Sequence, residues 1–151
     1  MIIQRVNRSN PEKVFVVVRN DSAASIGKGY PVVFIMDGTR DGLDITDAKT
    51  GAAAKAHLIA GLLDSALAAG SYGLAQCYGV RTDAPILKCG TATAKNAAIG
   101  DALVLHTAAS IISGVAAGAV SAWYAGMVMG QTMASSSATA TTTATVFLRL
   151  M

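Results

Sequence analysis

The sequence predicts a small, mainly β protein: a single-domain small β-barrel or β-sandwich with at most one or two short helices and an extended N-terminal arm. Three stretches favour this fold class. Val14 to Arg19 is a β-branched run, Thr145 to Leu150 alternates apolar and other residues, and Ala56 to Val80 has two apolar runs that face each other across a Gly-containing turn. A chain of 151 residues is of a size for one domain with one core.

Residues 1–13 are expected to form an arm and residues 14–151 a β-rich domain. Met1 to Val6 reads as a short extended segment, and Asn7 to Pro11 reads as a turn before the first strand. Two interpretations of the segment stay open. It lies on a neighbouring subunit, by adding a strand to an exposed sheet edge, or it is an ordinary edge strand of its own domain.

The second strand is expected at Val32 to Met36, after a turn at Ile26 to Pro31. Pro31 lacks an amide hydrogen, so it should stand at the beginning of that strand or on an edge. Asp37 to Asp47 is a polar excursion marked by glycine, and Thr46 to Ala56 is expected to form a short helix.

The central stretch has apolar side chains on both faces, which predicts strands in the middle of the sheet. One face is expected to carry Leu58, Ala60, Leu62, Leu74 and Gln76, and the other Ile59, Leu63, Ala75 and Cys77. The steps Tyr72-Gly73 and Tyr78-Gly79 indicate a bend or bulge where another backbone comes close.

Later in the chain, Val80 to Pro85 is expected to be a loop, followed by strands at Ile86 to Gly90 and Ala102 to His106. The segments SIGKGYPVVF and AIGDALVLH share an Ile-Gly-polar turn that leads into an apolar strand, which indicates two similar β-corners in one domain. In the last strand, Val146, Leu148 and Leu150 share one face.

The composition favours a protein that is covered by partners. Hydrophobic residues make up 52% of the chain, aromatic residues 5% and charged residues only 14%. Sparse charge together with apolar surface is typical of association. The net charge of +3 comes with no Lys/Arg block, so the sequence gives no support for direct nucleic-acid binding.

A membrane alternative arises from the region between Ala102 and Leu148, which holds no charged side chain apart from the titratable His106. A helix over Ala108 to Gly130 would be long enough to span a bilayer. However, the segment is rich in Ala, Gly, Ser and Thr, which insert far less favourably than Leu, Ile or Phe. A β fold without a membrane is therefore the favoured interpretation. The basic start of the chain has no long apolar run behind it, so no secretory signal is expected.

No constellation of residues favours catalysis, and we expect neither an enzyme nor a bound cofactor. His57 and His106 each stand among apolar residues and are favoured as core or interface side chains. Cys77 and Cys89 are favoured as reduced, buried side chains, with a disulfide between neighbouring strands as the alternative. The Gly27-Lys28-Gly29 triplet lacks the spacing of a phosphate-binding loop and is a turn.

The segment DGTRDGLDITD is the one constellation with ligand character. Its aspartates are Asp37, Asp41, Asp44 and Asp47. Calcium prefers such oxygen ligands, but the spacing of an EF-hand is absent. A solvated loop is favoured, and no metal site is expected.

The order of several short motifs along the chain is similar to tailed-bacteriophage capsid decoration proteins, also called cement or head-stabilising proteins. The motifs are the Asn-Asp-Ser turn, IGKGYPVV, the apolar run IAGLL at Ile59 to Leu63, AAGSYGLAQCYGV, IGDALVL, GQTMA and TVFLRL. The likeness extends from Val14 to Leu150, and the chain departs from better-known members in its uncharged, alanine-rich final third.

The resemblance implies a structural virion protein that binds the outer surface of the capsid and has no active site. Its expected partners are the major capsid protein and further copies of itself, as a homotrimer or, alternatively, a dimer. It would be made in the cytoplasm of the bacterial host. The residues expected to contact the capsid or another copy are Ile2, Ile3, Arg5, Arg8, Trp123, Tyr124, Met127 and Met129. The alternatives are a holin-like membrane protein that uses residues 102–148, and a carbohydrate- or receptor-binding β-module of the virion.

Overall fold

The computed structural model describes residues 12–47, 58–88, 102–105, 112–114, 126–128 and 140–150. These ranges are mainly β and contain no α-helix, which confirms the predicted class of a small, mainly β domain. The strands are β1 (Lys13–Asn20), β2 (Pro31–Phe34), β3 (Asp44–Asp47), β4 (Ile59–Leu63), β5 (Tyr72–Lys88), β6 (Ala102–Leu105), β7 (Ile112–Gly114), β8 (Gly126–Val128) and β9 (Ala140–Arg149).

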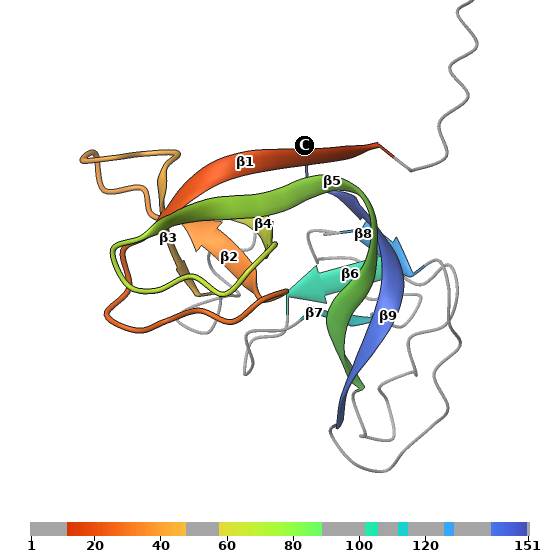
Figure 1. Ribbon diagram of the computed structural model, residues 1–151. Helices are drawn as coiled ribbons and strands as arrows, with labels where there is room; N and C mark the ends of the chain where they lie inside the picture. Colours follow the sequence, from red (N-terminus) through yellow and green to blue (C-terminus); the bar gives the residue numbers. More distant parts are fainter. Residues whose placement is uncertain are drawn as a thin grey trace, which may run out of the picture.

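All of these strands belong to one sheet that closes on itself rather than to two stacked sheets. Its order is β1-β3-β2-β4-β5-β7-β6-β8-β9, with additional pairings of β1 with β5 and of β5 with β9. The additional pairings produce two closed circuits. The first circuit contains β1, β3, β2, β4 and β5, and the second contains β5, β7, β6, β8 and β9. The long, curved β5 belongs to both circuits, and β1 and β9 lie beside different parts of it (Figure 1).

The buried residues form two clusters rather than the single core that we expected. The first contains Val18, Ile26, Val32, Ile45, Ala60, Leu63, Leu67 and Ala75. The second contains Leu62, Ala84, Ile86, Ala144, Val146 and Leu148. Leu62 and Leu63 are neighbours in β4, and their side chains enter different clusters because successive residues of a strand point to opposite faces. This confirms that the central pair buries apolar residues on both faces.

The predicted alternation in β4 is wrong before Gly61. Ala60 packs in the cluster of Leu63, whereas Ile59 packs against the cluster of Leu62. The pairing of β2 with β4 shifts register at this point, where Val32 is opposite Gly61 and Val33 is opposite Ile59. A bulge of this kind reverses the faces of the residues that precede it.

The predicted loop at Val80 to Pro85 is also wrong, since these residues continue β5. They pair with β9 from Val80 opposite Phe147 to Pro85 opposite Thr143, with a register shift between Arg81 and Ala84. The predicted strand that begins at Ile86 is therefore the last part of β5, which ends at Lys88.

The bend predicted at Tyr78-Gly79 is confirmed. The register of β5 against β1 shifts between Val14 and Phe15, which are opposite Tyr78 and Gln76. At Gly79 the φ angle is +98°, and a Cβ placed there would overlap the carbonyl oxygen of Glu12. Only glycine allows the backbone of β1 to come this close.

The first and last predicted strands are confirmed with different bounds: β1 is one residue longer at each end, whereas β9 begins five residues earlier and ends one residue earlier than predicted. In β9, Val146 and Leu148 are buried and Arg149 is exposed, as the alternating pattern predicted. The ring of Phe147 meets the ring of Tyr78 edge to face, with 5.2 Å between the ring centroids. β9 thereby joins the sheet by side-chain packing as well as by its backbone ladder.

Three further predictions differ from the structure in their bounds. β2 ends at Phe34, because Met36 is exposed in the following loop. Thr46 and Asp47 belong to β3 and not to a helix that begins at Thr46; residues 48–57 lie outside the described ranges. β6 ends at Leu105, one residue before the predicted end.

The two segments that share an Ile-Gly turn lead into β2 and β6, which occupy corresponding places two strands from β5 in the two circuits. Within Ala108 to Gly130, strands β7 and β8 contradict the alternative of a continuous helix. Across the described ranges, no helix is long and apolar enough to cross a membrane.

Candidate docking surface

The outward face of the β1–β5 pair carries four of the large apolar side chains that the described residues expose. The exposed fractions are 36% for Phe15, 58% for Val17, 62% for Tyr72 and 44% for Leu74. Met36 is 51% exposed and lies in the loop between β2 and β3. In the antiparallel register Val17 is directly opposite Leu74, and Arg19 is opposite Tyr72. Residues directly opposite one another point to the same face. We call Phe15, Val17, Tyr72 and Leu74 the outer apolar patch.

This patch follows from the composition of β1, in which Val14 to Val18 are all apolar. On the inward face Val18 is buried in the first cluster, and Val16 packs against it. The strand alternates its faces, so Phe15 and Val17 must point outward. A strand with a polar outer face would alternate apolar and polar residues here. In β1 both faces are apolar instead, so an apolar patch is left exposed.

The patch ends where β5 passes from the first circuit to the second. Gln76 is opposite Phe15 in the register, yet it is buried. Its Nε2 donates hydrogen bonds to the carbonyl oxygens of Tyr78, at 3.2 Å, and Val80, at 3.3 Å. The face of β5 that is open at Leu74 therefore turns into the interior of the second circuit at Gln76.

A network of charged side chains borders the patch at the carboxyl end of β1. Arg19 Nη1 donates to Asp21 Oδ1 at 2.9 Å and to Asp44 Oδ1 and Oδ2 at 3.1 and 3.2 Å. The hydrogen bond to Asp44 is the main cause of a raised pKa for Arg19. Asp44 is nearly buried, so this pair holds β1 against β3 and fixes one end of the patch.

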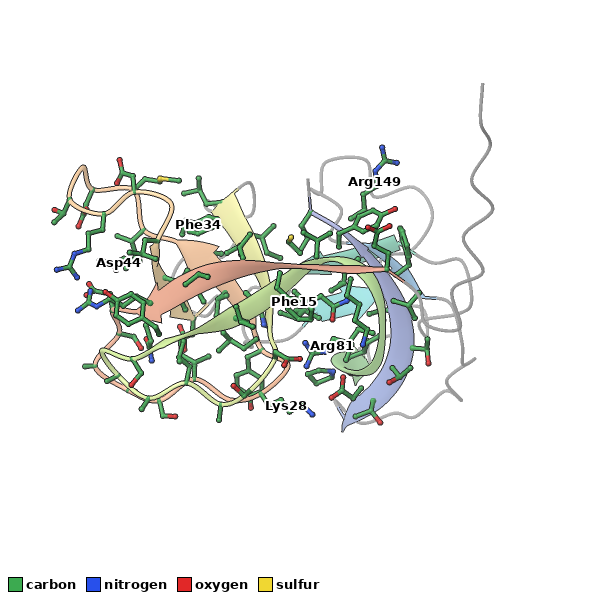
Figure 2. The ribbon with its side chains drawn as sticks, turned by 45° about the horizontal axis from the view of Figure 1, so that its top comes forward. Phe15, Lys28, Phe34, Asp44, Arg81 and Arg149 are labelled. Carbon is green, nitrogen blue, oxygen red and sulfur yellow. The ribbon has the colours of Figure 1, made fainter. Side chains whose placement is uncertain are left out.

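A second charged cluster surrounds the bulge in β5. Lys28 Nζ lies 2.8 Å from Asp83 Oδ2, and Arg81 Nε lies 3.0 Å from Asp83 Oδ1. The hydrogen bond from Lys28 is the main cause of a lowered pKa for Asp83. Figure 2 places Lys28 and Arg81 on the same side of the molecule.

The guanidinium of Arg81 is almost fully buried. Its Nη1 donates to the carbonyl oxygen of Leu62 at 3.3 Å. The contact of its Nε with Asp83 is an ion pair without hydrogen-bond geometry, and Nη2 has no hydrogen-bond partner within the described ranges. Because Arg81 reaches β4 and Asp83 reaches the turn at Lys28, the cluster ties the turn before β2 to the shared strand.

Two of the four aspartates with ligand character, Asp37 and Asp41, stabilise the loop that contains them. Asp41 Oδ1 accepts hydrogen bonds from the backbone N–H groups of Asp37 and Gly38, and Asp37 Oδ1 accepts one from Thr39. Asp44 bonds to Arg19 instead. No group of three or more His, Cys, Asp or Glu side chains could hold a metal ion within the ranges that the structure describes.

Cys77 is a free, buried thiol whose Sγ donates to the carbonyl oxygen of Val14 at 3.4 Å. Cys89, His57 and His106 lie outside the described ranges. The Gly27-Lys28-Gly29 segment forms a turn, as predicted, in which the N–H of Tyr30 donates to the carbonyl oxygen of Gly27 at 3.3 Å.

Of the eight predicted interface residues, one lies within the described ranges. Met127 lies in β8, where it is opposite Ala102 of β6 and Phe147 of β9. The others lie outside the described ranges: Ile2, Ile3, Arg5, Arg8, Trp123, Tyr124 and Met129. The sequence did not predict the outer apolar patch, because the continuous apolar run of β1 shows two apolar faces but not which of them stays uncovered.

The described residues define a small, mainly β domain with an apolar patch exposed on one face. The chain matches no protein-family model, and no curated protein sequence is similar to it.

Proposed function

We propose that this chain is a structural virion protein of a tailed phage. It binds the outer surface of the capsid, bridges neighbouring major capsid subunits and stabilises the expanded, DNA-filled head. It does so without catalysis, and it reaches the virion from the cytoplasm of the bacterial host. The observation that carries the proposal is the outer apolar patch, together with the order of motifs that is similar to decoration proteins.

The patch is better suited to a permanent contact with another protein than to exposure to water. Its four side chains lie on two strands that are hydrogen-bonded to each other, so they form a stiff platform. A stiff surface loses little conformational entropy on binding. Charged residues at the border, such as Arg19 and Asp21, would orient the contact while the apolar centre supplies its stability.

The proposed mechanism is thermodynamic. A subunit that spans two coat subunits must dissociate before they separate, so its binding free energy adds to the stability of the shell. Each contact need only be modest. Burial of a whole Leu or Tyr side chain contributes roughly 1.5–3 kcal/mol, so covering the exposed parts of Tyr72 and Leu74 contributes on the order of 1 kcal/mol each. Many such sites on one lattice resist internal pressure together.

The test is co-sedimentation of the purified protein with expanded, undecorated heads of the phage that encodes it. Wild-type protein should sediment with the heads to a fixed stoichiometry. Tyr72→Lys and Leu74→Lys, which place a charge in the patch, should each weaken binding by about tenfold or more. Met36→Lys is the matched control, because Met36 is equally exposed but lies outside the patch, and it should bind as the wild type does.

The proposal is refuted if the wild type fails to bind at any stoichiometry. If Leu74→Lys and Met36→Lys bind the heads equally well, the claim that the outer apolar patch contacts the capsid is refuted. Decorated heads should further resist heating or chelation better than undecorated heads, which measures the contribution to shell stability directly.

A further inference from the structure

Within the residues that the structure describes, one edge of β1 has no strand partner along most of its length. β5 pairs with β1 from Lys13 to Arg19 on one side. On the other side, within the described ranges, β3 pairs only with Arg19 and Asn20. Figure 1 shows β1 along the top of the molecule with β5 below it. An open strand edge of this kind is a template for pairing with another chain.

The direction of the backbone groups on this edge follows from two hydrogen bonds. The N–H of Arg19 donates to the carbonyl oxygen of Leu43, just before β3, at 2.9 Å, whereas the N–H of Asn20 donates to Ser71, just before β5, at 2.9 Å. Backbone groups alternate along a strand. Val17 and Phe15 therefore direct their N–H and C=O groups to the open edge, and Val16 and Val18 direct theirs to β5.

We propose that residues Met1–Val6 of a second copy of this chain add a strand to the open edge of β1. The described part of the chain begins at Glu12, directly before β1, and the six residues Met1–Val6 match the open stretch from Lys13 to Val18 in length. The segment reads MIIQRV, so Ile2, Ile3 and Val6 supply the β-branched residues that strands favour.

The composition of the chain favours a second copy as the source of this segment. Only 14% of the residues are charged, and so little charge together with exposed apolar surface is typical of chains that associate. Two copies related by a two-fold axis would each give a segment and receive one, so that both open edges are closed. This strand addition uses the edge of β1 and leaves the face with Tyr72 and Leu74 free.

The inference concerns association between copies in the absence of any capsid, so it holds or fails independently of the proposed function. The first test is sedimentation velocity on the full chain and two variants. Val17→Pro removes an N–H from the open edge without removing a bond to β5, and Ile3→Pro interrupts the donated segment. The wild type should be an oligomer and each variant alone should be a monomer, and an equal mixture should form a mixed dimer with one exchanged segment.

Two matched controls separate edge pairing from loss of fold. Val17→Thr keeps both the β-branch and the N–H, so it should associate as the wild type does. Val16→Pro removes a donor to β5, so it should unfold the first circuit, whereas Val17→Pro should keep the circular dichroism of a folded β protein.

A second measurement needs no proline on β1. Hydrogen exchange at the amides of Phe15 and Val17 should be slow in the wild-type oligomer and at least about tenfold faster in Ile3→Pro, with the amides of Val16 and Val18 unchanged. The inference is overturned if the wild type is a monomer, if Ile3→Pro still associates, or if the amides of Phe15 and Val17 are protected in a monomer. The last result would assign the edge to the chain's own segment.

Discussion

The close approach of β1 to β5 at Gly79 can be measured with a pair of alanine substitutions. Gly79 has a φ angle of +98°, and an added Cβ would overlap the carbonyl oxygen of Glu12 and lie 3.1 Å from the Cα of Lys13. Gly38 has a similar φ angle of +84°, but no atom of the described residues lies within 4 Å of a Cβ placed there. The two positions therefore share the backbone strain and differ only in the contact.

The magnitudes follow from these two contributions. A non-glycine residue in a left-handed conformation costs about 1–2 kcal/mol, which is the whole effect expected for Gly38→Ala. At Gly79 the methyl group must also push β1 away from β5, and overpacking of this kind costs roughly a further 1–3 kcal/mol. We therefore expect Gly79→Ala to lower the free energy of unfolding by about 2–5 kcal/mol in total.

The assay is urea unfolding of both variants and the wild type, monitored by circular dichroism. Thermal unfolding is the second measurement. For a chain of this length each 1 kcal/mol shifts Tm by roughly 2–4 °C, so the two variants should be clearly separated. Equal destabilisation by Gly79→Ala and Gly38→Ala would refute the reasoning, because it would mean that β1 does not lie against β5 at this point.

Three further outcomes are expected. Leu62→Ala should destabilise the protein by about 2–5 kcal/mol in urea unfolding, because Leu62 is fully buried in the second cluster; a loss below about 1 kcal/mol would contradict that packing. Asp83→Asn should lower stability near neutral pH by about 1–3 kcal/mol, because Asp83 pairs with the largely exposed Lys28 and also with the almost fully buried guanidinium of Arg81. The pKa of Asp83 is lowered in the fold, so this difference should be present above about pH 4 and disappear as the pH falls further, and a difference that persists in acid would contradict the ion pair. In a Cys89→Ser background, Cys77 should react with a thiol reagent at pH 8 at least about a hundredfold more slowly than in denaturant, because burial raises its pKa; rapid reaction in the native protein would contradict its burial.

The strands that the sequence predicted well are those with a strong local pattern. The β-branched run of β1 and the alternation of β9 are sufficient to identify strands without any knowledge of their partners. The pairing of β4 with β5 could also be predicted, because two apolar runs separated by a turn with glycine pair most simply with each other.

The continuation of β5 could not be predicted from local pattern. Arg81, Thr82, Asp83 and Pro85 together are typical of a loop. They are held in a strand by β9, whose long antiparallel ladder spans the bulge, and by the burial of Arg81 against the carbonyl oxygen of Leu62. These are contacts between residues distant in sequence, and no window of a few residues contains them.

The docking surface was missed for a related reason. The sequence shows that Phe15 and Val17 share one face of a strand, but not whether another part of the chain covers that face. Their exposure depends on where β5 crosses from the first circuit to the second, which places Leu74 outside and Gln76 inside. The position of that crossing is a property of the closed sheet as a whole.

Sharing one strand between two circuits also sets an order of assembly during synthesis on the ribosome. Every strand of the first circuit lies before residue 89, whereas β6, β7, β8 and β9 all follow it. The first circuit can therefore close while the remainder of the chain is still being translated, and it then presents β5 as a ready template. The second circuit must wait for β9, the last of its strands to be translated, so its apolar cluster is exposed for longer than that of the first circuit and its closure is the step more open to aggregation.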